Sequence, residues 1–113
     1  QTLDLSDNSI GALPAGVFNG LTKLEFLSLR GNAISSIPRD LFRDAISLVE
    51  LDLSWNHLTS IPDFAFAGLQ RLQELNLDTN WIFQMNSSAF FPLRDLTSLT
   101  LSVSYPMWYL APG

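Results

Sequence analysis

Residues 48–71 read LVELDLSWNHLTSIPDFAFAGLQR, and this stretch decides the fold because its pattern recurs along the chain every 24 residues. Asn8, Asn32, Asn56 and Asn80 are separated by this step, and columns of leucine, phenylalanine and proline keep the same step. Aligned on the period, the unit reads L-x-x-L-x-L-x-x-N-x-(I/L)-x-x-(I/L)-P-x-x-x-F-x-x-L-x-x. Chance can produce one such coincidence, but not many columns in phase. The chain is therefore an array of structural repeats.

The L-x-L segment of each unit predicts a strand. Leucines alternate there with polar residues, which is the period-2 pattern of a strand with one buried face. One strand per repeat, always in the same direction, stacks into a parallel sheet with neighbours about 4.8 Å apart. The asparagine that follows carries two donors and an acceptor. We therefore expect a structural ladder that satisfies the turns and links adjacent coils, made of Asn8, Asn32, Asn56 and Asn80.

The second half of each unit predicts the convex side of a solenoid. The phenylalanine column is expected to stack on the far side of the core and to widen it, which curves the stack and leaves the strands on the concave face. The prolines, and the lack of a 10-residue helical pattern, predict short 3₁₀ or extended convex segments instead of full helices. The predicted fold is of the α/β class: a right-handed leucine-rich repeat solenoid with a curved parallel sheet.

These motifs carry a family resemblance. The 24-residue spacing with proline and phenylalanine in the second half resembles the typical extracellular class of leucine-rich repeats, which includes Toll-like receptor ectodomains and variable lymphocyte receptors. Residues 13–24, LPAGVFNGLTKL, are similar to a variable lymphocyte receptor repeat, and residues 61–69, IPDFAFAGL, suit several of these receptors. The resemblance covers the whole chain and implies an extracellular domain, secreted or on the cell surface.

The domain prediction is one leucine-rich repeat array over residues 1–113, with about four full repeats and an irregular partial repeat over residues 96–113. After Leu101 the period breaks, and Ser104 stands where the next asparagine is due. Neither end carries the cysteine cap of the extracellular proteins that the chain resembles, and solenoids need capped ends. We interpret the chain as a fragment of a longer capped array; a small protein complete at 113 residues is the alternative.

Composition narrows the classes of partner and cofactor. A hydrophobic share of 47% with 15% charged residues is not that of a disordered tail. The net charge of -5, without a Lys/Arg cluster, argues against a nucleic-acid partner. Because there is no cysteine, no thiolate metal site is possible in these residues, and we expect no metal and no cofactor. Residues 96–113 are free of charge but broken by serines and prolines, so we expect no direct membrane contact.

Catalysis finds little support in the sequence. There is one histidine, His57, and no Gly-rich phosphate loop. Asp52, Ser54 and His57 lie close together, but the first two are predicted on the solvent face of one strand, and the histidine in the following turn lacks oxyanion donors. A non-enzymatic binding module is the stronger prediction.

The solvent face of the predicted sheet is the candidate binding surface. Its twenty outward positions hold six of the 11 acidic residues but only Arg30 of the 6 Lys and Arg residues. A solvated polar face, made acidic by common strand-end residues, is the alternative. The candidate ligand-binding residues are Asp4, Phe26, Ser28, Arg30, Glu50, Asp52, Ser54, Trp55, Glu74, Asn76, Asp78 and Trp81.

Two acidic residues suggest the kind of partner. Glu50 and Glu74 occupy the same column on neighbouring strands, so like charges sit side by side, which costs stability. A basic protein surface would relieve that repulsion. A Ca²⁺ ion is an alternative, since hard cations take clustered carboxylates.

Three aromatic residues are predicted on exposed surface. Phe26 and Trp55 occupy positions that should face water, and Trp81 neighbours His57 in the equivalent turn of the previous coil. Exposed aromatics amid polar residues are typical of binding hot spots. Packing against neighbouring aliphatic stems is the alternative.

The predicted function is a non-enzymatic ligand-recognition module of an extracellular, immune-type leucine-rich repeat receptor, which binds a protein or glycan ligand on its concave face. The alternative is a structural, matrix or signalling-receptor domain that mediates protein–protein interaction without an immune role. Asn86-Ser87-Ser88 is the only N-x-(S/T) sequon, so Asn86 is the predicted glycosylation site, on the convex return. The oligomeric state stays open.

Overall fold

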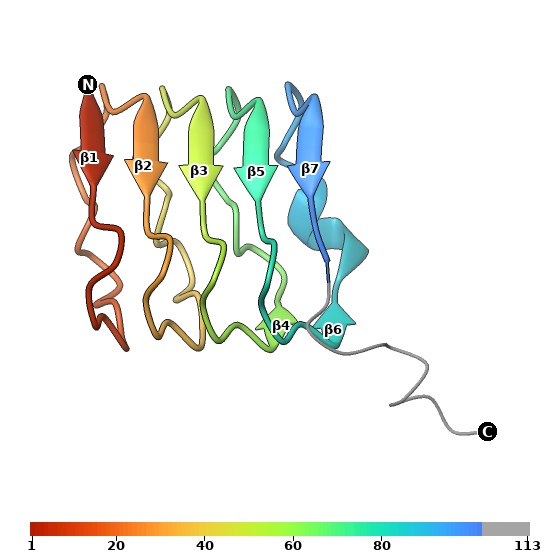
Figure 1. Cartoon of the computed structure of the whole chain (residues 1–113). Coiled ribbons are helices and arrows are strands. Elements are labelled where there is room, and N and C mark those ends of the chain that lie inside the picture. Colours follow the sequence, from red (N-terminus) through yellow and green to blue (C-terminus); the bar gives the residue numbers. More distant parts are fainter. Residues whose placement is uncertain (103–113) are drawn as a thin grey trace.

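The structure, a computed structural model, describes residues 1–102. Each repeat contributes one three-residue strand to a five-stranded parallel sheet, and neighbouring strands follow one another along the chain (Figure 1). Leu27 pairs in register with Leu51, and Leu51 with Leu75, so the predicted leucine columns are confirmed. The strands of the sheet, in order, are β1 (Thr2–Asp4), β2 (Phe26–Ser28), β3 (Glu50–Asp52), β5 (Glu74–Asn76) and β7 (Ser98–Thr100).

The in-register leucines form the core behind the sheet. Leu27 is fully buried, and Leu51 and Leu75 are almost so. Full burial of such a side chain stabilises the fold by about 1.5–3 kcal/mol. Leu3 and Leu99, on the two outer strands, keep part of their surface exposed. Each coil is thus stabilised mainly by the coils on either side of it.

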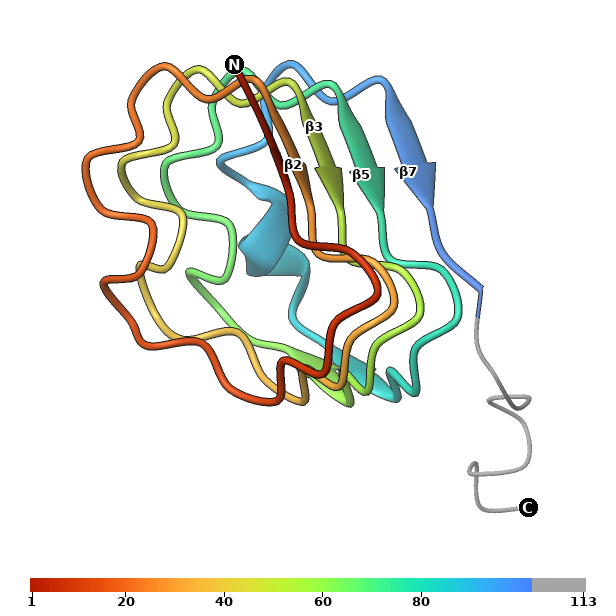
Figure 2. The same cartoon turned by 60° about the vertical axis from the view of Figure 1, so that its left-hand side comes forward.

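The return side of each coil has little regular structure. Within residues 1–102 the only helix is the 3₁₀ segment η1 (Ser87–Phe90), and β4 (Ser60–Ile61) pairs with β6 (Gln84–Met85) in a second, two-stranded sheet. Two pairs of the phenylalanine column lie in ring contact: Phe18 stacks on Phe42 with 6.1 Å between ring centroids, and Phe66 lies tilted against Phe90 at 5.8 Å. Figure 2 shows the five-stranded sheet along one side of the coils and the irregular returns on the other. The predicted leucine-rich repeat solenoid is confirmed.

The asparagine ladder is buried from the second coil onward. Asn56 donates from Nδ2 to the carbonyl oxygen of Leu53 in its own turn and to that of Leu29 in the preceding coil, and its Oδ1 accepts from the amide of Ile34. Asn8 differs, because its Nδ2 donates only within its own turn and the residue is exposed. A ladder residue therefore links coils only where a coil precedes it.

A second 24-residue column immediately precedes the ladder and was not anticipated. Its members have left-handed backbone, with φ of 56° at Asp7, 73° at Gly31, 56° at Trp55 and 53° at Thr79. Glycine suits Gly31, since a residue without a Cβ adopts this left-handed φ at no steric cost. A side chain in this conformation costs about 1–3 kcal/mol. Trp55 and Thr79 bear that cost at the exit of their strands.

Residues 103–113, which belong to the predicted partial repeat over residues 96–113, lie outside the described residues, and with them Ser104 at the position where the next asparagine is due. Over the part of the chain that is described, no helix is both long and apolar enough to cross a bilayer.

Candidate ligand-binding face

The parallel register aligns the outward side chains of the five-stranded sheet into columns, and we call this surface the sheet face. Residues that are paired across adjacent strands stand side by side on it. The first column contains Thr2, Phe26, Glu50, Glu74 and Ser98. The second contains Asp4, Ser28, Asp52, Asn76 and Thr100.

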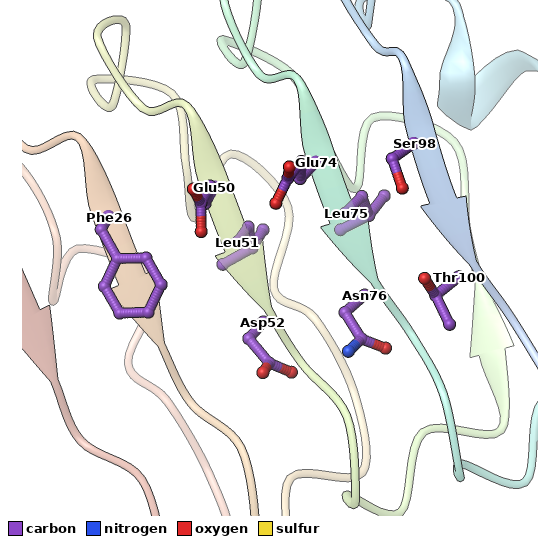
Figure 3. A pocket seen from close by; sticks show the side chains of 9 residues that line it. All are labelled: Phe26, Glu50, Leu51, Asp52, Glu74, Leu75, Asn76, Ser98 and Thr100. Atoms are coloured by element: carbon purple, nitrogen blue, oxygen red, sulfur yellow. The ribbon is translucent and has the colours of Figure 1, made fainter.

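A depression of about 140 Å³ lies on the sheet face, across β2, β3, β5 and β7, and is called the hollow below (Figure 3). The structure brings five of the predicted site residues together there. Ser98 and Thr100 also line it and were not among the predicted site residues, although they are the register partners of Glu74 and Asn76. The residues that line the hollow are Phe26, Glu50, Leu51, Asp52, Glu74, Leu75, Asn76, Ser98 and Thr100.

The hollow has uncompensated negative charge. Glu50 pairs directly with Glu74 across β3 and β5, and both are exposed, so the predicted juxtaposition of like charges is confirmed. Among residues 1–102 the only ion pair joins the amino terminus of Gln1 to Glu25, with 3.2 Å between nitrogen and oxygen. No base of the described chain therefore neutralises the two glutamates.

Two other acidic residues of the sheet face, Asp52 and Asp4, accept hydrogen bonds from a serine two residues further along the chain. The Oδ1 of Asp52 accepts from the backbone amide of Ser54 at 2.9 Å and from its hydroxyl. Asp4 accepts in the same way from Ser6, at 3.0 Å from the amide and 2.6 Å from the hydroxyl. The hydroxyl of Ser6, and then its amide, lower the pKa of Asp4 by stabilising the carboxylate. Asp4 lies on β1, away from the hollow.

The predicted exposure of two serines is wrong. Ser54 is 0% exposed and Ser28 is 6% exposed, so neither presents a side chain to a ligand. Ser28 is the last residue of β2, whereas the chain has already left β3 at Ser54, and the hydroxyls of both bond locally. The hydroxyl of Ser54 donates to Asp52 and accepts from Nη1 of Arg30, while the hydroxyl of Ser28 accepts from the amide of Arg30. Both serines support the face without forming its surface.

The exposed tryptophans lie outside the hollow. Trp55 is 54% exposed, and the guanidinium of Arg30 lies 5.9 Å from its ring centroid. Trp81 is 47% exposed and stacks on His57, with 5.3 Å between centroids and 15° between planes. Their predicted exposure, and the predicted neighbourhood of Trp81 and His57, are confirmed. Phe26 is half-buried.

The last predicted residue, Asp78, is half-buried and accepts a hydrogen bond from the hydroxyl of Ser102. The candidate site thus divides into residues in the hollow and residues that lie outside it.

The arrangement does not have the geometry of a catalytic triad. The hydroxyl of Ser54 donates to Asp52 and the ring of His57 stacks on Trp81, so the histidine does not serve the serine as a base. Over the described range 1–102, no group of three or more His, Asp or Glu side chains could hold a metal ion.

Parallel strands, one per coil, joined by an internal asparagine ladder, define a leucine-rich repeat solenoid. The leucine rich repeat family model matches residues 1–58 and 46–103, so the chain belongs to this family. No curated protein sequence matches it at a significant level.

The solved structures similar to the chain include ectodomain structures of Toll type. A TLR13–ssRNA13 complex is 34% identical, with a TM-score of 0.81, over 89% of this chain and 14% of that chain. A Drosophila Toll–Spatzle complex in its glycosylated form is 28% identical, with a TM-score of 0.84, over 95% of this chain and 15% of that chain. A second Toll–Spatzle structure, 22% identical with a TM-score of 0.85, supports the fold alone. The chain spans about a seventh of the length of these proteins, and the predicted resemblance to Toll-like receptor ectodomains is confirmed.

One prediction about partners needs correction. The TLR13 structure is a complex with ssRNA, so a similar array of repeats occurs in a protein that is in complex with nucleic acid. Net charge averages over the whole chain and does not describe a single face. The charge of -5 therefore does not exclude nucleic acid as a ligand class for such repeats.

Proposed function

We propose that this chain is a non-enzymatic ligand-recognition module of an extracellular, immune-type leucine-rich repeat receptor, and that the sheet face binds the ligand. The hollow carries this proposal. Glu50 and Glu74 line it side by side, are exposed, and carry like charges, so their placement there costs stability. Groups that cost stability but line a depression are better explained by a partner that covers them.

The chemistry of the hollow favours a protein ligand with a basic surface. Two exposed carboxylates attract lysine and arginine side chains and repel phosphates. The Toll–Spatzle complex supports a protein ligand by analogy, and the TLR13–ssRNA13 complex supports nucleic acid. Between the two, the acidic hollow favours the protein. A glycan is the remaining class, and a matrix or signalling partner without an immune role would use the same face.

The extracellular part of the proposal is supported by Asn86. Its side chain is exposed, and it lies between β6 and η1, outside the five-stranded sheet. A glycan there would leave the hollow open. Secretion from eukaryotic cells followed by peptide mass mapping tests this: we expect a glycan on the wild type that is lost in Asn86→Gln. An unmodified Asn86 in the secreted wild type would contradict the glycosylation site.

The proposed function is tested by screening the protein for binding to defined panels of secreted and cell-surface proteins, glycans and single-stranded RNA. Each ligand found is measured again with Glu74→Lys and with Asp95→Lys, which changes net charge equally but lies outside the sheet face. We expect a basic protein whose binding is lost with Glu74→Lys and kept with Asp95→Lys. A ligand that depends on Asp95 and not on Glu74, or an RNA ligand, would overturn the assignment.

A further inference from the structure

The shape and lining of the hollow define its ligand more narrowly than its charge does. We infer that the hollow receives an arginine side chain presented by the protein ligand. This inference rests on the proposed function and names the chemistry that the sheet face recognises.

The two glutamates supply the first contact. Glu50 and Glu74 are partners on adjacent strands, which lie about 4.8 Å apart in a sheet, so their carboxylates can flank one cation. A guanidinium has five N–H donors in a planar fork and reaches two carboxylates with charge-assisted hydrogen bonds. Its charge would replace the repulsion between the glutamates with attraction to both.

Phe26 supplies the second contact. It is the register partner of Glu50 on β2, and Figure 3 shows its ring at one end of the hollow, on the strand beside Glu50. A planar cation can stack on this ring while its edge faces the carboxylates. The same chain already makes two such contacts: Arg39 lies 4.6 Å from the ring centroid of Phe64, and Arg30 lies 5.9 Å from that of Trp55.

The stacking surface distinguishes arginine from lysine. Lysine carries a compact, strongly hydrated charge, whereas the guanidinium is planar, weakly hydrated and suited to lie on an aromatic face. An apolar side chain would bury the carboxylates without a partner, and an anion would be repelled. Arginine is the side chain whose shape and charge both match Phe26, Glu50 and Glu74.

The far side of the hollow suits the main chain around such an arginine. The Oδ1 of Asn76 accepts from the amide of Asp78 at 2.9 Å, which leaves the side-chain amide nitrogen to donate to a ligand carbonyl. The hydroxyls of Ser98 and Thr100 line the same side and can donate or accept. The arginine would thus be held as part of a peptide segment.

The test uses two peptides, acetyl-Gly-Arg-Gly-amide and acetyl-Gly-Lys-Gly-amide, at equal ionic strength. Binding is followed by amide chemical shifts of the ¹⁵N-labelled protein. We expect the shifts to move on β2, β3 and β5, and the arginine peptide to bind about two- to fivefold more tightly. Glu50→Gln with Glu74→Gln should abolish binding of both peptides. Phe26→Leu should remove the preference for arginine, and Asp95→Asn should change neither.

Equal affinities for the two peptides, or shifts that move mainly around Asp95, would overturn the inference. Glu50 and Glu74 are exposed, so their variants keep the fold even if Phe26→Leu does not, and the double variant still decides whether the hollow is the site. The inference about arginine and the proposed function can be refuted by different results. A protein ligand that needs Glu74 but binds unchanged after all its arginines become lysines would refute the inference and leave the function standing.

Discussion

Asn56 donates a 2.9 Å hydrogen bond from its Nδ2 to the carbonyl oxygen of Leu29, which lies 27 residues earlier in the preceding coil. Asn32 makes the equivalent bond to Leu5, and Asn80 the equivalent bond to Leu53. The ladder is therefore a repeated connection between coils, and it acts on the edge where the strands of the sheet end.

Asn56→Ala tests this connection. The substitution removes the acceptor of the buried Ile34 amide and one of the two side-chain donors to the carbonyl oxygens of Leu29 and Leu53. We therefore expect the free energy of unfolding to fall by about 2–3 kcal/mol in a urea titration. Asn8→Ala is the matched control, because Asn8 is exposed and bonds only within its own turn; it should cost less than about 1 kcal/mol. Equal losses in the two variants would contradict the role of the ladder between coils.

Gly31→Ala tests the left-handed column. The backbone there has φ of 73°, which a residue with a side chain adopts only with strain, so we expect a loss of about 1–3 kcal/mol in thermal or urea unfolding. The exposed carboxylate of Asp7, which the new Cβ would meet, can rotate away. Gly11→Ala is the control: a Cβ at Gly11 meets nothing within 4 Å, and the change should stay within about 0.5 kcal/mol. Unchanged stability of Gly31→Ala would mean that this turn tolerates a side chain.

Trp55 should lower the stability of the fold through its strained backbone and strengthen the binding of a ligand through its indole. Because its φ is 56°, glycine relieves backbone strain there, and we expect Trp55→Gly to be about 1 kcal/mol more stable than Trp55→Ala. Once a protein ligand is known, surface plasmon resonance should show faster dissociation for both variants. If the indole is a hot spot, the binding free energy should weaken by about 2 kcal/mol. Arg43→Glu, an exposed change outside the sheet face, should leave the rates unchanged. Dissociation rates like those of the wild type would exclude Trp55 from the contact.

The repulsion between Glu50 and Glu74 should be measurable without a ligand. Glu74→Gln removes one of the two charges, so we expect the free energy of unfolding to rise by about 0.2–1 kcal/mol at low salt, and the gain to shrink as salt screens the pair. Asp95→Asn makes the same change in net charge. If both variants gain equally, the effect belongs to net charge and not to the pair.

The carboxylate of Asp4 should respond to its partner Ser6. The folded-state pKa of Asp4 lies below the ordinary value of 3.8, because the Ser6 hydroxyl and amide stabilise the ionised form. The contribution of this group to stability is therefore present above about pH 3.8 and is lost as pH falls through the folded-state pKa. In a ¹³C carboxyl titration we expect Ser6→Ala to raise the pKa of Asp4 and Ser9→Ala to leave it as it was. An identical titration in Ser6→Ala would refute the assigned cause.

The 24-residue period is enough to predict the solenoid, its strands and its asparagine ladder. A repeat of constant length places each residue beside its own counterpart one coil away, so columns in the sequence become columns in the structure. The pairing of Glu50 with Glu74 and the stacking of Trp81 on His57 follow from this arithmetic. No long-range information beyond the period is needed, since each coil contacts mainly its neighbours.

Which of these side chains reach solvent, and what they bond to, depends on the three-dimensional packing of the coils and does not follow from the period. Alternation predicted Ser54 outside, but the strand ends after three residues and the turn carries the serine inward, where it bonds Asp52. The left-handed backbone at Trp55 and the grouping of Phe26 with the two glutamates in one hollow depend on turn geometry and on the spacing of strands. Period-2 alternation holds only while the backbone stays extended, and where it ends, packing between coils sets the direction of each side chain.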